Sequence, residues 1–245
     1  MATIVFACKS NSCRSQMAEG WAHKWIQDQL YIYKESLQEF QEEDGKEADY
    51  FDEKWARRIK DHISLLESTA VASVALDSTA VFNDTSSPMS GSDCCQRQRK
   101  QVKSKAVEAM AKDGVDISLY RPKTITELLP VLTNETKTLS KPESEHEREK
   151  FHININNKIL EDVVIEEMES TPVKHVDKLI VLCSCGEELK YELTRRSKSV
   201  EEWSIDAPTA ASKAGEGDRA YQRVSLEIKK EVNILMGSLI PKPFL

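Results

Sequence analysis

The stretch TIVFACKSNSCRSQMAEGWAHKWI, residues 3–26, decides the fold of this chain. It begins with a short apolar run, residues 3–7, which is typical of a buried strand in a parallel sheet. After a polar loop, apolar side chains recur at helical spacing at Met17, Trp21 and Trp25. The stretch therefore predicts a strand, a loop and a helix in direct succession.

The loop between this strand and helix carries Cys8 and Arg14 at C-x5-R spacing. Backbone N–H groups of such a loop, together with a helix N-terminus, bind anions. The same field stabilises thiolates and lowers cysteine pKa values from about 8.5 to roughly 3.5–7.5. We therefore expect an oxyanion site with Cys8 as a thiolate nucleophile and Arg14 gripping two oxygens through its planar guanidinium.

A simpler interpretation takes Cys8 as a buried strand residue and Arg14 as a surface cation. An arginine at a helix N-terminus is disfavoured unless an anion offsets it, which favours the oxyanion site. In that site we expect Ser15 to donate a hydrogen bond to the sulfur and Asn11 to brace the loop. The residues expected to surround the oxyanion are Lys9, Ser10, Asn11, Ser12, Cys13, Arg14 and Ser15.

The remaining sequence alternates apolar runs with amphipathic segments. Strands are predicted at 69–78 and 178–185, with a possible strand near 151–155. An alternation of strands and helices implies an α/β fold, a parallel sheet covered on both sides. Two helices are predicted between 30 and 67, with Gly45 in the turn between them, and a third at 97–112, which Gly114 ends. A short helix is predicted to begin at Thr124, with Glu127 as its capping partner. A loop at 203–212 precedes the last predicted helix, at 220–236.

Composition excludes several classes of function. A net charge of −7 argues against nucleic-acid binding, because phosphate neutralisation needs a basic face. The one short basic run, Arg97, Arg99, Lys100, Lys103 and Lys105, is interpreted as a solvated segment. No apolar run is long enough to span a membrane, so no membrane partner is expected.

The chain has 6 cysteines, at positions 8, 13, 94, 95, 183 and 185. They are too few to staple a secreted fold of 245 residues, and the close pairs suit redox or metal chemistry better. We therefore expect a reducing compartment and a cytoplasmic protein.

The segment FACKSNSCRSQMAEGWA, residues 6–22, resembles the N-terminal signature of thiol-dependent arsenate reductases, which share their fold with low-molecular-weight tyrosine phosphatases. Weaker resemblance continues, in the family's order, through SVA at 73–75, KAVEAMAKDGVDIS at 105–118, KLIVLC at 178–183, EWSIDAP at 202–208 and the final helix. It implies one domain over residues 1–245, with a three-layer fold and a four-stranded parallel sheet flanked by helices. Helical and acidic insertions would lie near 28–67, 84–100 and 137–175.

The resemblance also implies a reaction. Cys8 would attack arsenate at arsenic, and Cys183 would resolve the adduct as a disulfide and release arsenite. No bound cofactor is expected, and an external thiol reductant such as thioredoxin, glutaredoxin or glutathione would complete the cycle. The partners would be an arsenate or phosphate oxyanion and a thiol reductant protein.

Two departures from the family's pattern affect these roles. Thioredoxin-coupled members have a third cysteine seven residues after the second, a position without cysteine here. The redox candidates to replace it are Cys185, which is equally well interpreted as a packing residue, and Cys94 and Cys95, which we interpret more readily as bystanders. Cys13 is expected to be structural or a protective disulfide partner.

The second departure concerns the general acid, an Asp directly before Pro in the family. Ala207 stands there, and Asp206 one position earlier is the candidate acid. The phosphatases also have aromatic residues after that Pro to flank tyrosine, whereas Thr209, Ala210 and Ala211 follow Pro208. The missing Asp before Pro208 and the missing aromatic residues after it favour arsenate over phosphotyrosine as the substrate.

Some of these reductases bind potassium near the loop, at positions like Asn11, Glu19 and Ser73 together with a carboxylate. Lys123 falls near that carboxylate position, and its ammonium would replace the ion electrostatically. We therefore expect no metal site and no potassium requirement. An exposed lysine before a helix is the alternative interpretation of Lys123.

Two other functions stay open at the level of sequence. One is a low-molecular-weight tyrosine phosphatase of the same fold. The other is a non-catalytic thiol protein in which Cys94, Cys95, Cys183 and Cys185 sense oxidants or bind a soft metal, although their spacing matches zinc sites poorly.

Overall fold

A computed structural model describes residues 2–42, 50–82, 99–128, 176–184 and 187–243. In these residues four strands form one sheet in the order β2-β1-β3-β4, and all neighbouring pairs are parallel. The expectation of a four-stranded parallel sheet is confirmed. The strands are β1 (Thr3–Cys8), β2 (Ala70–Ala75), β3 (Val176–Val181) and β4 (Ser197–Glu202).

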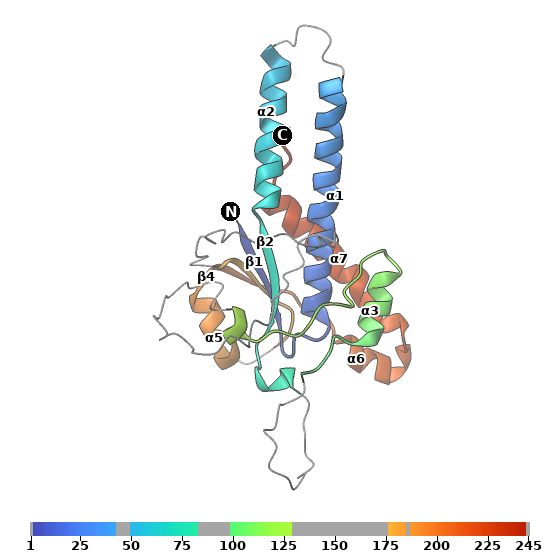
Figure 1. Ribbon diagram of the computed structural model, residues 1–245. Helices are drawn as coiled ribbons and strands as arrows, with labels where there is room; N and C mark the ends of the chain where they lie inside the picture. The colour runs from blue at the N-terminus through green and yellow to red at the C-terminus, as the bar shows by residue number, and fades with distance from the viewer. Residues whose placement is uncertain (1, 43–49, 83–98, 129–175, 185–186, 244–245) are drawn as a thin grey trace, which may run out of the picture.

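Helices lie on both faces of this sheet and make three layers (Figure 1). The helices α1 and α7 pack on each other, α1 also packs on β1 and β2, and α3 packs on α7. On the other side, α5 packs on β3 and β4 (Figure 1). The helices are α1 (Arg14–Glu42), α2 (Tyr50–Glu67), α3 (Ser104–Ala111), α5 (Glu187–Arg195), α6 (Pro208–Ala211) and α7 (Arg219–Leu239), with short helical turns η1 (Thr79–Val81) and η2 (Ser212–Glu216).

The core forms where β1 and β3 meet the inner faces of α1 and α7. Every residue of β1 is buried, including Phe6, and so are Met17 of α1 and Ile228 of α7. Full burial of one such side chain contributes roughly 1.5–3 kcal/mol. The core therefore fixes the junction between β1 and α1, at which Cys8 lies.

The prediction of two helices between residues 30 and 67 is wrong for the first of them. The sequence predicts two new helices after Leu30, whereas the first is the continuation of α1, which runs for 29 residues. The second, α2, is confirmed, and Gly45 lies outside the described residues. Figure 1 shows α1 and α2 side by side as an antiparallel pair that extends beyond the sheet.

The predicted helix at 97–112 begins later, at Ser104. Its preceding residue, Lys103, has extended backbone (φ −62°, ψ 129°) because its N–H donates to the carbonyl of Ser12 at 3.0 Å. Two expected helix ends are confirmed. Gly114 has φ 75° after the helix, and Thr124 and Glu127 exchange capping hydrogen bonds, with Thr124 N–H donating to Glu127 Oε2 at 2.7 Å.

The fourth strand, β4, has no apolar run that would predict it. Its sequence is SKSVEE, and all residues after Ser197 are exposed at the sheet edge. The predicted loop at 203–212 contains the short helix α6, whose first residue is Pro208. The possible strand at 151–155 lies outside the described residues.

Candidate active site

Cys8 is the last residue of β1, and Arg14 is the first residue of α1. The loop between them therefore joins a strand's carboxyl end to a helix N-terminus, the place where anions bind. Cys8 is 4% exposed, and its Sγ lies 2.9 Å from Ser15 Oγ, as the sequence predicts. A hydroxyl at this distance can stabilise a thiolate by donating to it.

Asn11 fixes the shape of this loop. It is buried and has φ 49°, a left-handed conformation that asparagine tolerates better than most residues. Its side-chain amide donates to Ser15 Oγ at 2.9 Å and to Ser73 Oγ at 2.8 Å. Its Oδ1 accepts from the backbone N–H of Lys123 at 2.7 Å. The predicted bracing role is thus present in the geometry, and it reaches β2 and the segment before Thr124.

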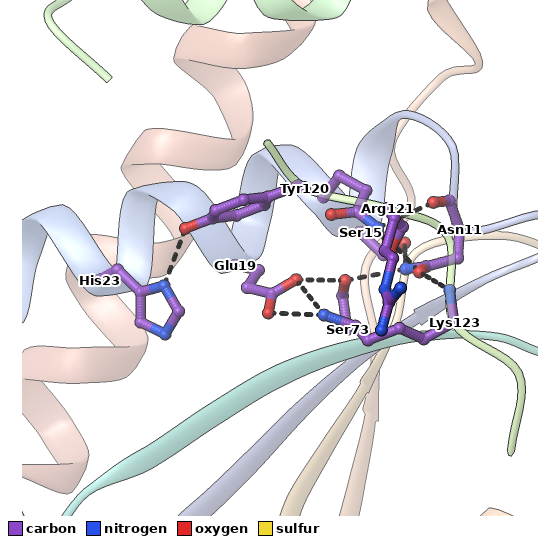
Figure 2. Close-up of polar contacts among 9 residues, drawn as sticks. Asn11, Ser15, Glu19, His23, Ser73, Tyr120, Arg121 and Lys123 are labelled. Atoms are coloured by element: carbon purple, nitrogen blue, oxygen red, sulfur yellow. Dashed lines mark hydrogen bonds and ion pairs between the residues drawn. The ribbon is translucent and has the colours of Figure 1, made fainter. Parts of the chain in front are cut away.

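Asn11 belongs to a buried polar network, which Figure 2 shows. Ser73 donates to Glu19 Oε2 at 2.5 Å, and the ammonium of Lys123 lies 2.8 and 3.1 Å from the two oxygens of Glu19. Hydrogen bonds therefore run without a break from Lys123 through Glu19, Ser73, Asn11 and Ser15 to Cys8.

At the positions where some of the similar reductases bind potassium, this chain has an ion pair between Lys123 and Glu19. Glu19, whose side chain is 7% exposed, is neutralised by Lys123, whose side chain is 30% exposed. The interpretation of Lys123 as a merely exposed lysine is wrong. Among the described residues no group of three or more His, Cys, Asp or Glu side chains could hold a metal ion.

His23 of α1 and Tyr120 form a hydrogen-bonded pair near this network, and the sequence pattern gave no sign of them. His23 Nδ1 lies 2.8 Å from the hydroxyl of Tyr120, with the two rings edge to face (Figure 2). Burial lowers the pKa of His23 from 6.5, and nearby Glu19 opposes that shift while Lys123 adds to it. Burial also raises the pKa of Tyr120. The pair is therefore neutral near pH 7.

Arg14 connects the loop to the segment after β4. Its Nη1 donates to the carbonyl of Ile205 at 2.7 Å. The next residue, Asp206, has its side chain 80% exposed, with Oδ2 at 3.9 Å from Arg223 Nη1. Arg14 thus holds the backbone of the candidate acid at the loop, while the carboxylate of Asp206 faces Arg223.

The other loop residues differ in exposure. Lys9 is exposed, whereas Ser12 is buried with its hydroxyl 2.9 Å from that of Ser10. Cys13 is also buried, and burial raises the pKa of its thiol to about 12 despite the opposing charges of Lys103 and Arg14. Cys13 is therefore a protonated thiol beside the Cys8 site.

Cys183 lies at the strand end next to Cys8. Ala7 of β1 pairs with Val181 of β3, and the N–H of Leu182 donates to the carbonyl of Ala7 at 2.8 Å. Leu182 is therefore level with Cys8, and Cys183 is one residue further, buried at the same edge of the sheet. Cys183 is disulfide-bonded, whereas Cys8 and Cys13 are free thiols. The redox candidates Cys94, Cys95 and Cys185 lie outside the described residues.

The interpretation of the basic run as a solvated segment is wrong at three positions, Arg99, Lys100 and Lys103, which are half-buried. The ammonium of Lys100 donates to the carbonyl of Ala80 at 3.0 Å. Arg99 pairs with Glu127 at 2.6 Å and lies over the ring of Phe82. Lys103 is half-buried, and its ammonium lies 2.5 Å from Thr209 Oγ1 on α6. A pattern of basic residues at irregular spacing cannot reveal such contacts, because the partners come from other parts of the sequence.

Comparison with known proteins gives short matches in sequence. No family model matches the chain. It is 53% identical to the arsenate reductase of Bacillus licheniformis over 36 residues, 15% of this chain and 26% of that protein. It is 49% identical to the arsenate reductase of Bacillus subtilis over 35 residues, 14% and 25% of the two chains. The chain thus spans about a quarter of the length of the curated relatives it matches.

Solved structures match over nearly the whole chain but loosely. An arsenate reductase in the phosphate-binding state has a TM-score of 0.46 and 18% identity, covering 97% of this chain and 98% of its own. A low-molecular-weight tyrosine phosphatase from T. tengcongensis has a TM-score of 0.43 and 14% identity, covering 97% and 99%. Because both TM-scores are below 0.5, we assign the fold from the observed strand order of the sheet and not from these matches. In local sequence, over about 36 residues, this chain resembles arsenate reductases.

Proposed function

We propose that this protein is a thiol-dependent arsenate reductase in which Cys8 attacks arsenate and Cys183 resolves the adduct. The observation that carries the proposal is the neighbouring position of the two cysteines at the ends of β1 and β3. A phosphatase needs the Cys8 loop and a general acid but no second thiol, whereas a reductase needs a second thiol within reach of the first sulfur. The absence of an Asp before Pro208 and of aromatic residues after it supports the same choice.

In the first step the Cys8 thiolate attacks arsenic and forms an S–As bond. One As–O bond breaks, and the oxygen leaves as water after taking up protons. Arg14 and the backbone N–H groups of the loop neutralise the charge on the remaining oxygens. Asp206 is the proposed proton donor, which requires its exposed carboxylate to turn from Arg223 toward the loop.

The second step requires that the disulfide of Cys183 has first been reduced by the external thiol. The Cys183 thiolate then attacks the Cys8 sulfur and forms a new disulfide. The S–As bond breaks, and its electron pair stays on arsenic, which is reduced from As(V) to As(III) and leaves as arsenite. The two cysteines are oxidised by the same two electrons. An external dithiol protein or glutathione must reduce the disulfide before the next cycle.

The proposal is tested with reduced protein, arsenate and each of thioredoxin, glutaredoxin and glutathione, with arsenite as the measured product. The variant Cys8→Ser should abolish turnover. In the wild type, mass spectrometry should find a Cys8–Cys183 disulfide after arsenate treatment. The variant Cys183→Ser should stop the reaction after the first step and release no arsenite. Absence of arsenite with all three reductants would refute the proposal. Hydrolysis of an aryl phosphate without arsenate reduction would instead show a phosphatase.

A further inference from the structure

Lys103 occupies a position between the oxyanion loop and the segment that follows β4. Its backbone N–H donates to Ser12 in the loop at 3.0 Å, and its ammonium lies 2.5 Å from Thr209 Oγ1. The hydroxyl of Thr209 lies 3.2 Å from that of Tyr221 on α7, which holds the threonine in place. The ammonium of Lys103 is therefore fixed at the rim of the site.

Lys103 is an unusual residue for its place in α3. It is the N-cap residue, where Ser, Thr, Asp or Asn is preferred, and it makes no capping hydrogen bond through its side chain. A cation at a helix N-terminus is also disfavoured by the helix dipole. Arg14 has the same unfavourable placement at the start of α1. Two helix N-termini, each beginning with a cation, thus meet at the loop segment Ser12–Cys13.

The positive ends of two helices and the two cations Arg14 and Lys103 meet at this loop, and the single charge of the Cys8 thiolate offsets only part of their positive potential. Burial keeps the neighbouring thiol of Cys13 protonated, so Cys13 supplies no negative charge. The candidate acid Asp206 points toward Arg223 and is mostly exposed. A bound oxyanion with two negative charges would supply the negative charge that Cys13 and Asp206 do not provide.

We propose that Lys103 is a second cation of the oxyanion site and makes that site selective for small inorganic dianions over phosphate esters. This inference rests on the proposed function, since it assigns a specificity residue to the same loop. Thr209 is the first residue after Pro208, where the tyrosine phosphatases that the sequence resembles have aromatic residues beside the substrate's ester group. An ammonium there binds a charged oxygen, whereas an aryl ester would place an apolar ring beside it.

The experiment measures oxyanion binding without turnover. Reduced protein is alkylated at Cys8 with iodoacetamide, the modified peptide is quantified by mass spectrometry, and inorganic phosphate or phenyl phosphate is titrated as protectant. Lys103→Met should raise the phosphate concentration for half-protection about tenfold, and that for phenyl phosphate by less than about threefold. Lys103→Arg should restore phosphate protection, because it keeps the charge.

Two further variants separate charge from structure. Lys105→Met removes the same charge from the first turn of α3, where Lys105 is exposed and pairs with Asp218, and it should leave half-protection unchanged. Thr209→Val removes only the hydroxyl contact and should change half-protection less than Lys103→Met does. Circular dichroism and the unfolding midpoint confirm that each variant is folded.

Three results would overturn the inference: equal half-protection in the wild type and Lys103→Met, an equal loss in Lys105→Met, or no recovery in Lys103→Arg. A wild type that phosphate protects but that does not reduce arsenate refutes the proposed reaction and leaves the role of Lys103 standing. A wild type that neither phosphate nor arsenate protects refutes the oxyanion site and Lys103 together.

Discussion

Asn11 combines two requirements that few residues satisfy together. Its backbone is left-handed with φ 49°, and its buried side chain joins Ser15, Ser73 and the N–H of Lys123. Alanine would strain the backbone, remove one hydrogen bond from each of Ser15 and Ser73, and take away the partner of the Lys123 N–H. A lost hydrogen bond costs about 1 kcal/mol, and a buried group left unsatisfied costs roughly 1–3 kcal/mol. The geometry at Cys8 depends on this residue through Ser15.

Asn11→Ala should therefore lower the free energy of unfolding by more than about 3 kcal/mol and slow the alkylation of Cys8. Asn11→Gly loses the same hydrogen bonds but accepts a positive φ, so it should be the more stable of the two by about 1–2 kcal/mol. Urea unfolding measures both variants. Equal stability of alanine and glycine would show that the backbone conformation at residue 11 is not strained.

His23 gives the protein a stability term that depends on pH. Burial lowers the pKa of His23 from 6.5 in the folded state, so the unfolded state binds the proton more tightly. Stability from this group is complete above pH 6.5 and falls as the pH drops toward the folded pKa, by up to about 1.4 kcal/mol per pH unit.

The variant His23→Gln keeps a polar partner for Tyr120 and removes this titration. The stability of the wild type relative to this variant should decline between pH 7 and pH 5, as measured by urea unfolding at each pH. His62, whose pKa burial also lowers, is present in both proteins and cancels in the comparison. A difference that stays constant over this range would contradict the assignment.

At the residue scale the sequence predicted what short-range chemistry determines. The contact of Cys8 with Ser15 and the bracing by Asn11 follow from the loop itself. Lys103, His23 and Tyr120 were not recognised, because their partners lie 97 or more residues away in the sequence. Distant contacts of this kind leave no spacing pattern.

At the scale of elements, Gly20 sets the distance between α1 and the segment after α3. A Cβ at Gly20 would lie 2.7 Å from Ile117 Cγ2, 3.1 Å from Met110 Cε and 3.3 Å from Val115 Cγ1. These atoms belong to buried side chains, so they have little room to move. The close approach holds the segment before Tyr120 and Lys123 against α1.

Gly20→Ala should lower the unfolding midpoint, because overpacking costs about 1–3 kcal/mol and outweighs a gain in helix propensity of about 1 kcal/mol. Gly237→Ala is the matched control in α7, where a Cβ would meet no atom within 4 Å. That variant should be neutral or more stable by up to about 1 kcal/mol. A stabilising effect at both positions would show that the packing at Gly20 is loose.

The elements that the sequence predicted correctly are those with a buried, periodic face: β1, β2, β3, α2 and α7. The predicted start of α3 was wrong because the backbone before it pairs with distant segments: Lys103 donates to Ser12, Lys100 donates to Val81, and Arg99 forms a bridge with Phe82. The predicted end of α1 was wrong because the outer half of the helix packs on α2. Its apolar residues therefore lie on a different face from those of the inner half. In both cases tertiary contacts override local preference.

At the scale of the whole molecule, α1 belongs to two environments. Helix α1 packs on the sheet, α7 and α2. Figure 1 shows that its outer part extends beyond the sheet beside α2. Two ring contacts join that outer pair, Tyr33 with His62 at 4.6 Å and Phe40 with Trp55 at 5.2 Å. The outer part should open more readily than the inner part of the same helix.

Hydrogen exchange measured by mass spectrometry should therefore find residues 31–40 exchanging faster than residues 15–26. Phe40→Ala should accelerate exchange in residues 31–40 further and leave the alkylation rate of Cys8 unchanged. Uniform protection along α1 would show instead that the helix opens as one unit with the sheet.

The edge strand β4 has a consequence for the behaviour of the protein in concentrated solution. The outermost strand of a sheet has backbone groups that can pair with a strand of another molecule, which is a route to aggregation. In β4 an incoming strand would meet a row of charges at Lys198, Glu201 and Glu202, held by pairing with Asp177, Lys178 and Lys190. The polar sequence of β4, because of which the strand was not predicted, thus also disfavours pairing between the sheets of separate molecules.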